Sequence, residues 1–219
     1  MATTAKQRFD GMMSRCEKLV EHSRSPQLTL EVREDILRAV VVYAVSALDS
    51  YASDRFMENF TQQIKGRKLS YKELSLLEDA KVSVQMVLEL LCSKNARPFA
   101  VIRNQVAKHF ATRSRQSFSS INELYGYFGI KNIADHAIRF AKRETLMVKI
   151  NGMLKRRHRI VHEGDYDGKH RLARITEKEV LKWVKATKLF VESMESILQE
   201  CLERRKKSGK CSKMSKPNA

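Results

Sequence analysis

The chain has 219 residues, enough for one large domain or two small ones, and no shift in composition divides it. Only 8 glycines and 3 prolines are present, too few turn formers for a many-stranded β fold. The formal charge is +17, which favours a polyanionic partner over a generally basic surface. The N-terminus is polar and no uninterrupted apolar run reaches about 18 residues, so we expect neither a signal peptide nor a membrane span.

The positive charge is concentrated in three segments. Residues 94–122 carry six basic side chains and no acid. Residues 142–174 carry ten basic and four acidic side chains, and residues 204–219 carry seven basic side chains and no acid. The first 93 residues, in contrast, sum to zero. Such clustering is typical of proteins that bind nucleic acid.

The spacing of apolar residues predicts helices along the whole chain. In chain order they cover residues 5–24, 29–66, 70–91, 98–110, 120–128, 131–140, 143–162 and 176–198. The apolar run 39–45 also fits a buried strand, but the helical pattern continues beyond it and favours a helix. We expect a single all-α domain over residues 1–203, built as a bundle with accessory short helices. Residues 204–219 are expected to form a disordered basic tail.

Local signals mark several of the predicted helix ends. They are the N-cap Thr29, the end at Gly66, the capping boxes Ser70-x-x-Glu73 and Thr176-x-x-Glu179, Pro98 in a first turn, and the stop at Gly164.

Four cysteines, at positions 16, 92, 201 and 211, include no C-x-x-C pair. We expect free thiols in a reducing compartment, and hence a cytoplasmic protein.

One stretch, residues 154–167, combines arginines and histidines at the end of a predicted helix. Cleavage of RNA by its own 2′-hydroxyl requires a proton acceptor, a proton donor and positive charge on the phosphate. Histidine titrates near neutral pH, and arginine binds phosphate oxygens in a bidentate manner. The pair Arg157 and His162 has the spacing R-x4-H, the only instance in the chain. The spacing alone is weak, because looser pairs such as Arg103 and His109 arise by chance in a basic protein.

The surroundings of this pair are more informative. Residues 155–165 read Lys-Arg-Arg-His-Arg-Ile-Val-His-Glu-Gly-Asp. This string resembles the motif of the HEPN superfamily, in the branch called RiboL-PSP-HEPN, whose members show Lys-Arg-Arg-Asn-x-Ile-Val-His-Glu-x-Asp. Residues 44–51 resemble the family's early core helix with its Leu-Asp-x-Tyr element, and Ile175-Thr176 resembles the start of its last helix. The resemblance covers about residues 30–200.

The resemblance implies a helical bundle that pairs as a homodimer and cleaves RNA without a metal or other cofactor, often in toxin–antitoxin or anti-phage systems. It implies that Arg157 stabilises the phosphate and that His162 is the acid or base. His158 stands where the family usually has Asn, and His can form similar hydrogen bonds. The alternative is a non-catalytic HEPN module that binds RNA or a protein partner.

Further residues are expected to assist the pair. Supporting roles are assigned to Arg156, His158, Asp49 and Glu163; RNA contacts are assigned to Lys155, Arg159, Arg103 and Lys108. Asp49 fits two interpretations equally, one orienting Arg157 or His162 and one forming local hydrogen bonds. Glu163 either tunes the pKa of His162 or faces solvent, and the second is favoured.

A metal site is a further alternative, with His158 and His162 as ligands and Glu163 or Asp165 adding oxygens. The surrounding arginines disfavour a bound cation, so we expect no metal. The RNA target, whether tRNA, mRNA or rRNA, and any antitoxin or sensor protein stay open.

Helix geometry bears on the oligomeric state. Residues five apart lie about 140° apart around an ideal helix, so Arg157 and His162 do not share one face. Either the helix unwinds near Gly164, or a second subunit completes a composite site.

Overall fold

The computed structural model describes residues 3–66, 69–93, 97–111, 115–168 and 170–211. Within these residues every regular element is a helix, and the β contact is an isolated bridge between Tyr166 and Leu172. The helices are α1 (Ala5–His22), α2 (Leu30–Lys65), α3 (Tyr71–Asp79), α4 (Val84–Cys92), α5 (Pro98–Ala111), α6 (Phe118–Gly126), α7 (Ile133–Phe140), α8 (Leu146–Glu163) and α9 (Glu177–Cys211). The all-α prediction is confirmed.

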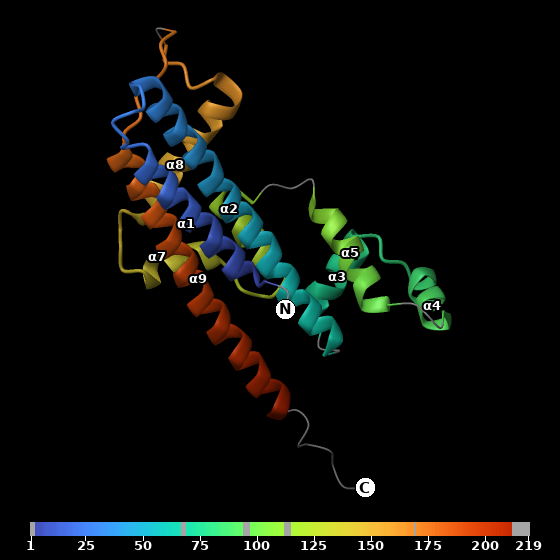
Figure 1. Cartoon of the computed structure of the whole chain (residues 1–219). Coiled ribbons are helices and arrows are strands. Elements are labelled where there is room, and N and C mark those ends of the chain that lie inside the picture. The colour runs from blue at the N-terminus through green and yellow to red at the C-terminus, as the bar shows by residue number, and fades with distance from the viewer. Residues whose placement is uncertain (1–2, 67–68, 94–96, 112–114, 169, 212–219) are drawn as a thin grey trace, which may run out of the picture.

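Four long helices form the bundle, α1, α2, α8 and α9 (Figure 1). The helix α2 packs against the other three, and α9 packs against α1 and α8 as well. Helix α7 covers α9 and also contacts α6, while α3 and α4 reach the bundle through α5, which packs on α2. The short helices are therefore accessory to a central bundle, as the sequence predicts.

Local hydrogen bonds fix several helix ends as predicted. The Thr29 hydroxyl accepts from the backbone N–H of Val32 and caps α2, which ends at Gly66. The backbone N–H of Ser70 donates to the Glu73 carboxylate at 2.6 Å, which is the return bond of the predicted capping box. These bonds satisfy backbone groups that the first turn of a helix leaves free.

Two boundaries differ from the prediction. The helix expected over residues 70–91 is two helices, because Lys81 adopts a left-handed φ of 58° and Ser83 caps a new helix. The polar break expected at residues 117–120 is instead the start of α6, where the Ser117 hydroxyl accepts from the backbone N–H of Ser120. In both places a serine that interrupts the apolar pattern begins a helix.

The basic tail also differs. We expected disorder from residue 204, but the backbone of α9 is helical through Cys211. Lysine and arginine are good helix formers, so a strongly charged segment can extend a helix that is already nucleated by the core. Residues 212–219 lie outside the described part of the chain.

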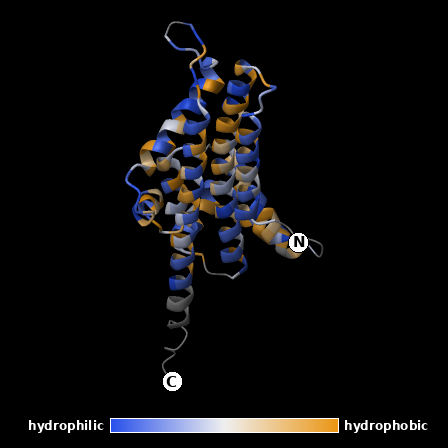
Figure 2. Ribbon diagram, turned by 60° about the vertical axis from the view of Figure 1, so that its left-hand side comes forward, coloured by the Kyte–Doolittle hydropathy of each residue, from blue (hydrophilic) through white to orange (hydrophobic). Residues whose placement is uncertain are grey.

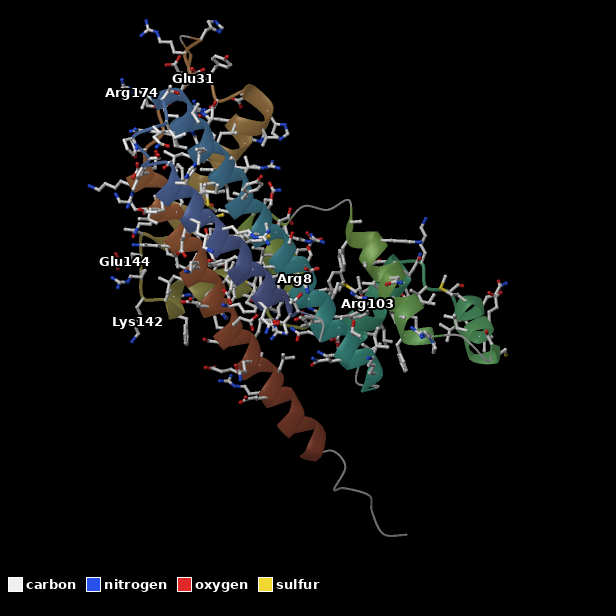
Figure 3. The ribbon with its side chains drawn as sticks, in the orientation of Figure 1. Arg8, Glu31, Arg103, Lys142, Glu144 and Arg174 are labelled. Atoms are coloured by element: carbon white, nitrogen blue, oxygen red, sulfur yellow. The ribbon has the colours of Figure 1, made fainter. Side chains whose placement is uncertain are left out.

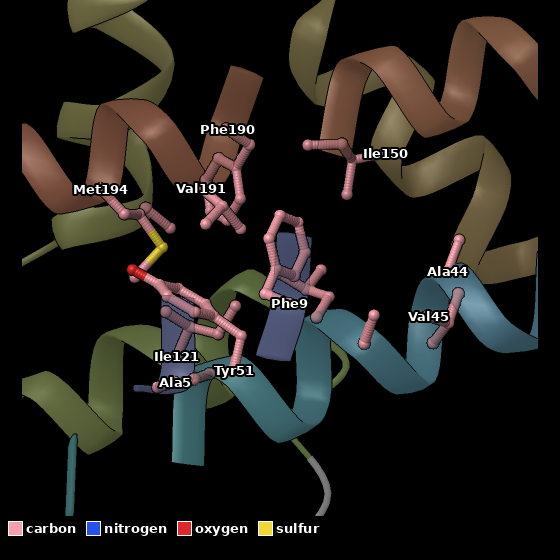
Figure 4. Packing of buried hydrophobic residues seen from close by; sticks show 14 of the residues in the cluster. Ala5, Phe9, Ala44, Val45, Tyr51, Ile121, Ile150, Phe190, Val191 and Met194 are labelled. Carbon is pink, nitrogen blue, oxygen red and sulfur yellow. The ribbon is translucent and has the colours of Figure 1, made fainter. Parts of the chain in front are cut away.

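The middle of α2 is the centre of the core, and the alternative of a buried strand there is wrong. Val40, Ala44, Val45 and Leu48 are at most 1% exposed. Figure 4 shows Phe9 of α1, Tyr51 of α2 and Phe190 of α9 meeting in the same core, and hydrophobic and hydrophilic residues alternate along the long helices in Figure 2. In the described residues α2 is the one helix long and apolar enough to cross a membrane, and 56% of that stretch is buried inside the bundle.

Among the described residues, the thiols of Cys16, Cys92 and Cys201 are free, as predicted; the Cys211 side chain is not described. Burial raises the pKa of the Cys16 thiol to about 11, so this thiol is protonated at neutral pH.

Phe56 joins the bundle to the accessory helices. Its ring lies 4.5 Å from that of Phe128 and 5.4 Å from that of Phe110, measured between centroids. We predict that Phe56→Ala lowers the free energy of unfolding by about 3–5 kcal/mol, because the cavity would open at this junction. Urea denaturation of both proteins measures the difference. Phe140→Ala, at a ring that is 52% exposed, is the control, and an equal loss in both variants would contradict this role.

Candidate functional site

The motif lies at the C-terminal end of α8, where the helix stops sharply. Gly164 caps the helix with a φ of 63°, a conformation that glycine adopts without strain. A Cβ atom added there would lie 3.1 Å from the ring of Tyr166. The next residue, Asp165, is also left-handed and donates its backbone N–H to the carbonyl of Arg159. The turn therefore directs the Asp165 side chain back into the bundle.

Asp165 is fully buried; two arginines donate to its Oδ2, and Arg159 Nη2 lies 3.9 Å from its Oδ1. The Asp165 Oδ2 accepts from Arg38 Nε at 2.9 Å and from Arg156 Nη2 at 2.8 Å. Arg38 and Arg156 both donate to the carbonyl of Ala173 as well. The network ties α2, the end of α8 and the segment before α9 together, and we name Arg38, Arg156 and Asp165 the arginine–aspartate clamp.

Arg38 is charged within this clamp although it is 7% exposed. Burial acts to lower its pKa, but hydrogen bonds to Asp165 and Glu34 act against burial and raise that pKa above its usual value. A buried charge of this kind is tolerated only with several close partners.

Arg156 has a different role from the one expected. We predicted that it supports the catalytic pair, but its Nη2 donates inward to Asp165 and to the carbonyls of Ala173 and Arg174. Its side chain is 12% exposed. The structure therefore assigns Arg156 to holding the helix end in place.

Sequence reasoning missed Arg38 entirely. One signal was present, because Arg38 shares a helical face with Val41 and Val45, which are at most 1% exposed. A cation in the core-facing register of an apolar helix needs a buried anion, and Asp165 is that anion.

Arg157 lies on the inward side of α8, in line with Ile150 and Met153 of the core. Its side chain is half-buried. Its Nε is buried and has no hydrogen-bond partner among the described residues. Unlike its neighbour Arg156, Arg157 is thus a cation without a carboxylate in the described part of the chain.

The two histidines lie together on the opposite, exposed side of α8. The rings of His158 and His162 are 4.7 Å apart between centroids. Lys155 is exposed on the same side, and the Arg159 side chain is 36% exposed and donates to the Tyr166 carbonyl at 3.3 Å. This face therefore combines two titratable rings with two cations.

The helix does not unwind between Arg157 and His162. The helix α8 is continuous to Glu163, so the first of the two alternatives for uniting the pair is wrong. The two side chains start about 140° apart, one toward the core and one toward solvent. Within one protomer the described geometry does not bring them onto a common face.

Asp49 does not lie with the motif. Its carboxylate accepts from the backbone N–H of Arg115 at 2.6 Å and from the amide of Gln116 at 3.1 Å. It is eleven residues after Arg38 on α2, about 16 Å along the axis. Of the two interpretations, these contacts favour hydrogen bonding at the start of α6 over a role in orienting Arg157 or His162.

Glu163 is exposed, and its Oε1 lies 3.9 Å from His158 Nε2, which agrees with the solvent-facing interpretation. Asp165 is bound by arginines and is not available as a ligand. No cluster of three or more metal-binding side chains is found in the part of the chain that the structure describes.

Arg103 and Lys108 are exposed on α5. Figure 3 shows Arg103 far from Arg174, which follows the motif in the chain. Helix α5 meets α2 near Phe56, whereas the clamp meets it at Arg38, roughly 27 Å away along the axis. Arg115, counted with the same basic segment, is 2% exposed and lies under the ring of Phe110. The structure therefore separates this segment from the RNA contacts predicted on α8.

We predict that Asp165→Asn lowers the free energy of unfolding by about 3–5 kcal/mol, because Arg38 and Arg156 lose their shared, buried anion. Asp35→Asn is a matched control, since Asp35 also binds Arg38, at 3.0 Å, but its side chain is 63% exposed. The control is expected to cost at most about 1 kcal/mol. Chemical denaturation measures the free energy of unfolding of both variants. Equal losses would show that the clamp contributes no more stability than an exposed ion pair.

Comparison with known proteins identifies a family. The family described as RiboL-PSP-HEPN matches residues 13–200, from the middle of α1 to most of α9, and includes the whole motif. No match to a curated protein or to a solved structure was found. The bundle, the motif at the end of α8 and this match together show that the chain belongs to the RiboL-PSP-HEPN family.

Proposed function

We propose that the protein is a metal-independent endoribonuclease, a toxin or an anti-phage effector, with Arg157 and His162 at its centre. One observation carries the proposal: Arg156 is bound inward to Asp165, while Arg157 and His162 have no ion pair or side-chain hydrogen bond among the described residues. In a motif with so many arginines, these are groups left for an external ligand. Membership of the HEPN family supports RNA as that ligand.

Cleavage of RNA by its own 2′-hydroxyl requires a proton acceptor, a proton donor and positive charge at the phosphate. The 2′-oxygen attacks the adjacent phosphorus, and a histidine takes the proton of the 2′-hydroxyl. The bond from phosphorus to the 5′-oxygen breaks, and that oxygen receives a proton. The products are a 2′,3′-cyclic phosphate and a 5′-hydroxyl. An arginine stabilises the additional negative charge on the phosphate during the attack.

The paired rings suit the two proton transfers. His162 is the acid or base, and His158, with its ring centroid 4.7 Å away, supports it from the same face. His158 replaces the usual Asn of the family and adds a second titratable group there. Lys155 and Arg159 flank the rings and supply phosphate contacts.

A homodimer explains how Arg157 joins this face. Because α8 places Arg157 and His162 on different sides, we propose that Arg157 of one protomer faces His162 of its partner. A two-fold axis would then generate two equivalent sites.

A non-catalytic module that binds RNA or a protein partner is the second candidate. The observation in its favour is that the exposed face of α8 presents Lys155 and Arg159, which bind phosphate without any histidine chemistry. An antitoxin or sensor protein could occupy the same face.

The first test is cleavage of total RNA by the purified protein in EDTA. We predict that His162→Ala lowers the cleavage rate by about 100- to 10,000-fold, the usual contribution of a proton-transferring group. His136→Ala, which removes an exposed histidine on α7, is the matched control and is expected to cut like the wild type. If the wild type does not cut RNA, the second candidate replaces the nuclease. A requirement for magnesium would point to a metal site instead.

The second test concerns the shared site. Arg157→Ala and His162→Ala are each expected to be inactive, but a mixed dimer keeps one site in which both residues are intact. Mixing equal amounts under conditions that exchange subunits is predicted to restore about a quarter of the wild-type rate, since half of the dimers are mixed and each has one of two sites. A mixture that stays inactive, although mass spectrometry detects mixed dimers, would show that each site lies within one protomer.

A further inference from the structure

A groove lies between α1 and α2, away from the motif. It has a volume of about 490 Å³ and is lined by Met12, Arg15, Lys18 and Leu19 of α1 and by Tyr43 of α2. This volume falls within the range of sites for small ligands. The floor is mostly apolar, and the two cations are exposed at its edge.

Tyr43 is exposed in the largely buried middle of α2. Its side chain is 51% exposed, whereas its neighbours Val41 and Ala44 are at most 1% exposed. It starts about 140° around α2 from Arg38 and so points away from the clamp. An aromatic ring is thereby presented on the wall of the groove.

The two cations of the groove differ from their neighbours. Arg15 and Lys18 make no ion pair or side-chain hydrogen bond with the described residues. The other lysines and arginines of α1 and of the turn that follows it are paired with carboxylates. These pairs are Lys6 with Asp10, Arg8 with Asp54, and Arg24 with Glu21 and Glu177. Glu17, the remaining acid of α1, is bound by Lys188 at 2.8 Å. The groove therefore has an uncompensated positive edge.

We infer that this groove binds one nucleotide of single-stranded RNA, with the base stacked on Tyr43 and the phosphate bound by Arg15 and Lys18. A planar apolar face beside two free cations matches a base followed by its phosphate. The inference rests on the proposed function for its choice of RNA, and it adds a second contact on the substrate, distinct from the site of cleavage.

The arrangement of the bundle gives an RNA strand a path between the groove at Tyr43 and the motif at the end of α8. The end of α1 is joined to the start of α9 by the ion pair of Arg24 with Glu177. The segment that follows the motif leads into α9 at this same end, and it carries Arg171 and Arg174, both exposed. Figure 3 shows Arg174 near this end of the bundle. A strand held at Tyr43 would pass these cations before it reaches His162.

Binding of a fluorescent single-stranded RNA, followed by anisotropy, tests the inference. The full-length chain with His162→Ala is used, so that the probe is not cut. Tyr43→Ala is expected to weaken binding roughly 5- to 150-fold, the range found for the loss of one stacked base, and Tyr43→Phe is expected to retain it. Tyr71→Ala is the matched control, because Tyr71 is 86% exposed on α3.

The charges are tested in the same assay. The double variant Arg15→Gln with Lys18→Gln is expected to have a shallower dependence of the logarithm of the binding constant on the logarithm of the salt concentration. The slope is expected to decrease by the contribution of about two phosphate contacts. Lys182→Gln with Lys185→Gln, which removes two exposed cations of α9, is the control and is expected to change it less. Melting curves verify that every variant is folded.

The outcomes separate this inference from the proposed function. Weaker RNA binding by Tyr43→Ala supports the groove even if no RNA cleavage is ever observed. Unchanged binding overturns the groove even if His162 proves to be catalytic. If Tyr43→Ala leaves RNA binding unchanged but disrupts a dimer or the binding of an acidic protein, the groove is a protein contact and the inference is wrong.

Discussion

The contact of buried Asp165 with Arg38 and Arg156 determines the shape of the motif. A carboxylate with no exposed surface is stable only with cations beside it, and these come from two different helices. Because Asp165 follows Gly164 directly, its burial fixes the point at which α8 ends. Together with the packing of Ile150 and Met153 in the core, this pairing orients the basic face of α8 that carries the two histidines.

The clamp also divides the arginines by role. Adjacent residues on a helix point about 100° apart, so neighbours in a motif have different environments. Arg156 turns toward Asp165. Arg157 is half-buried, with an Nε that has no partner among the described residues. The Arg159 side chain is 36% exposed and lies 3.9 Å from Asp165. The net charge of the segment therefore overstates the charge that it can offer to a phosphate. The same holds for Arg115, whose charge lies inside the fold.

The helices and many of their ends were predictable because periodicity and caps are local properties. Thr29, Gly66 and Gly164 act where the sequence places them. The motif was found because its residues are contiguous. The clamp was not found, since Arg38 and Asp165 are 127 positions apart and only the folded chain brings them together. The position of Asp49 was open for the same reason, as its partners lie 66 and 67 residues away.

The opposite directions of Arg157 and His162 on α8 have a consequence for dosage. If each site requires two copies of the chain, only the dimer is active. When the protein is scarce, the dimer forms at a rate that depends on the square of the concentration of single chains. Basal expression would then leave nearly all copies as inactive single chains, whereas a rapid rise in synthesis would produce activity out of proportion to the amount made. The placement of two side chains on one helix would in this way give the cell a threshold, with no inhibitor needed to create it.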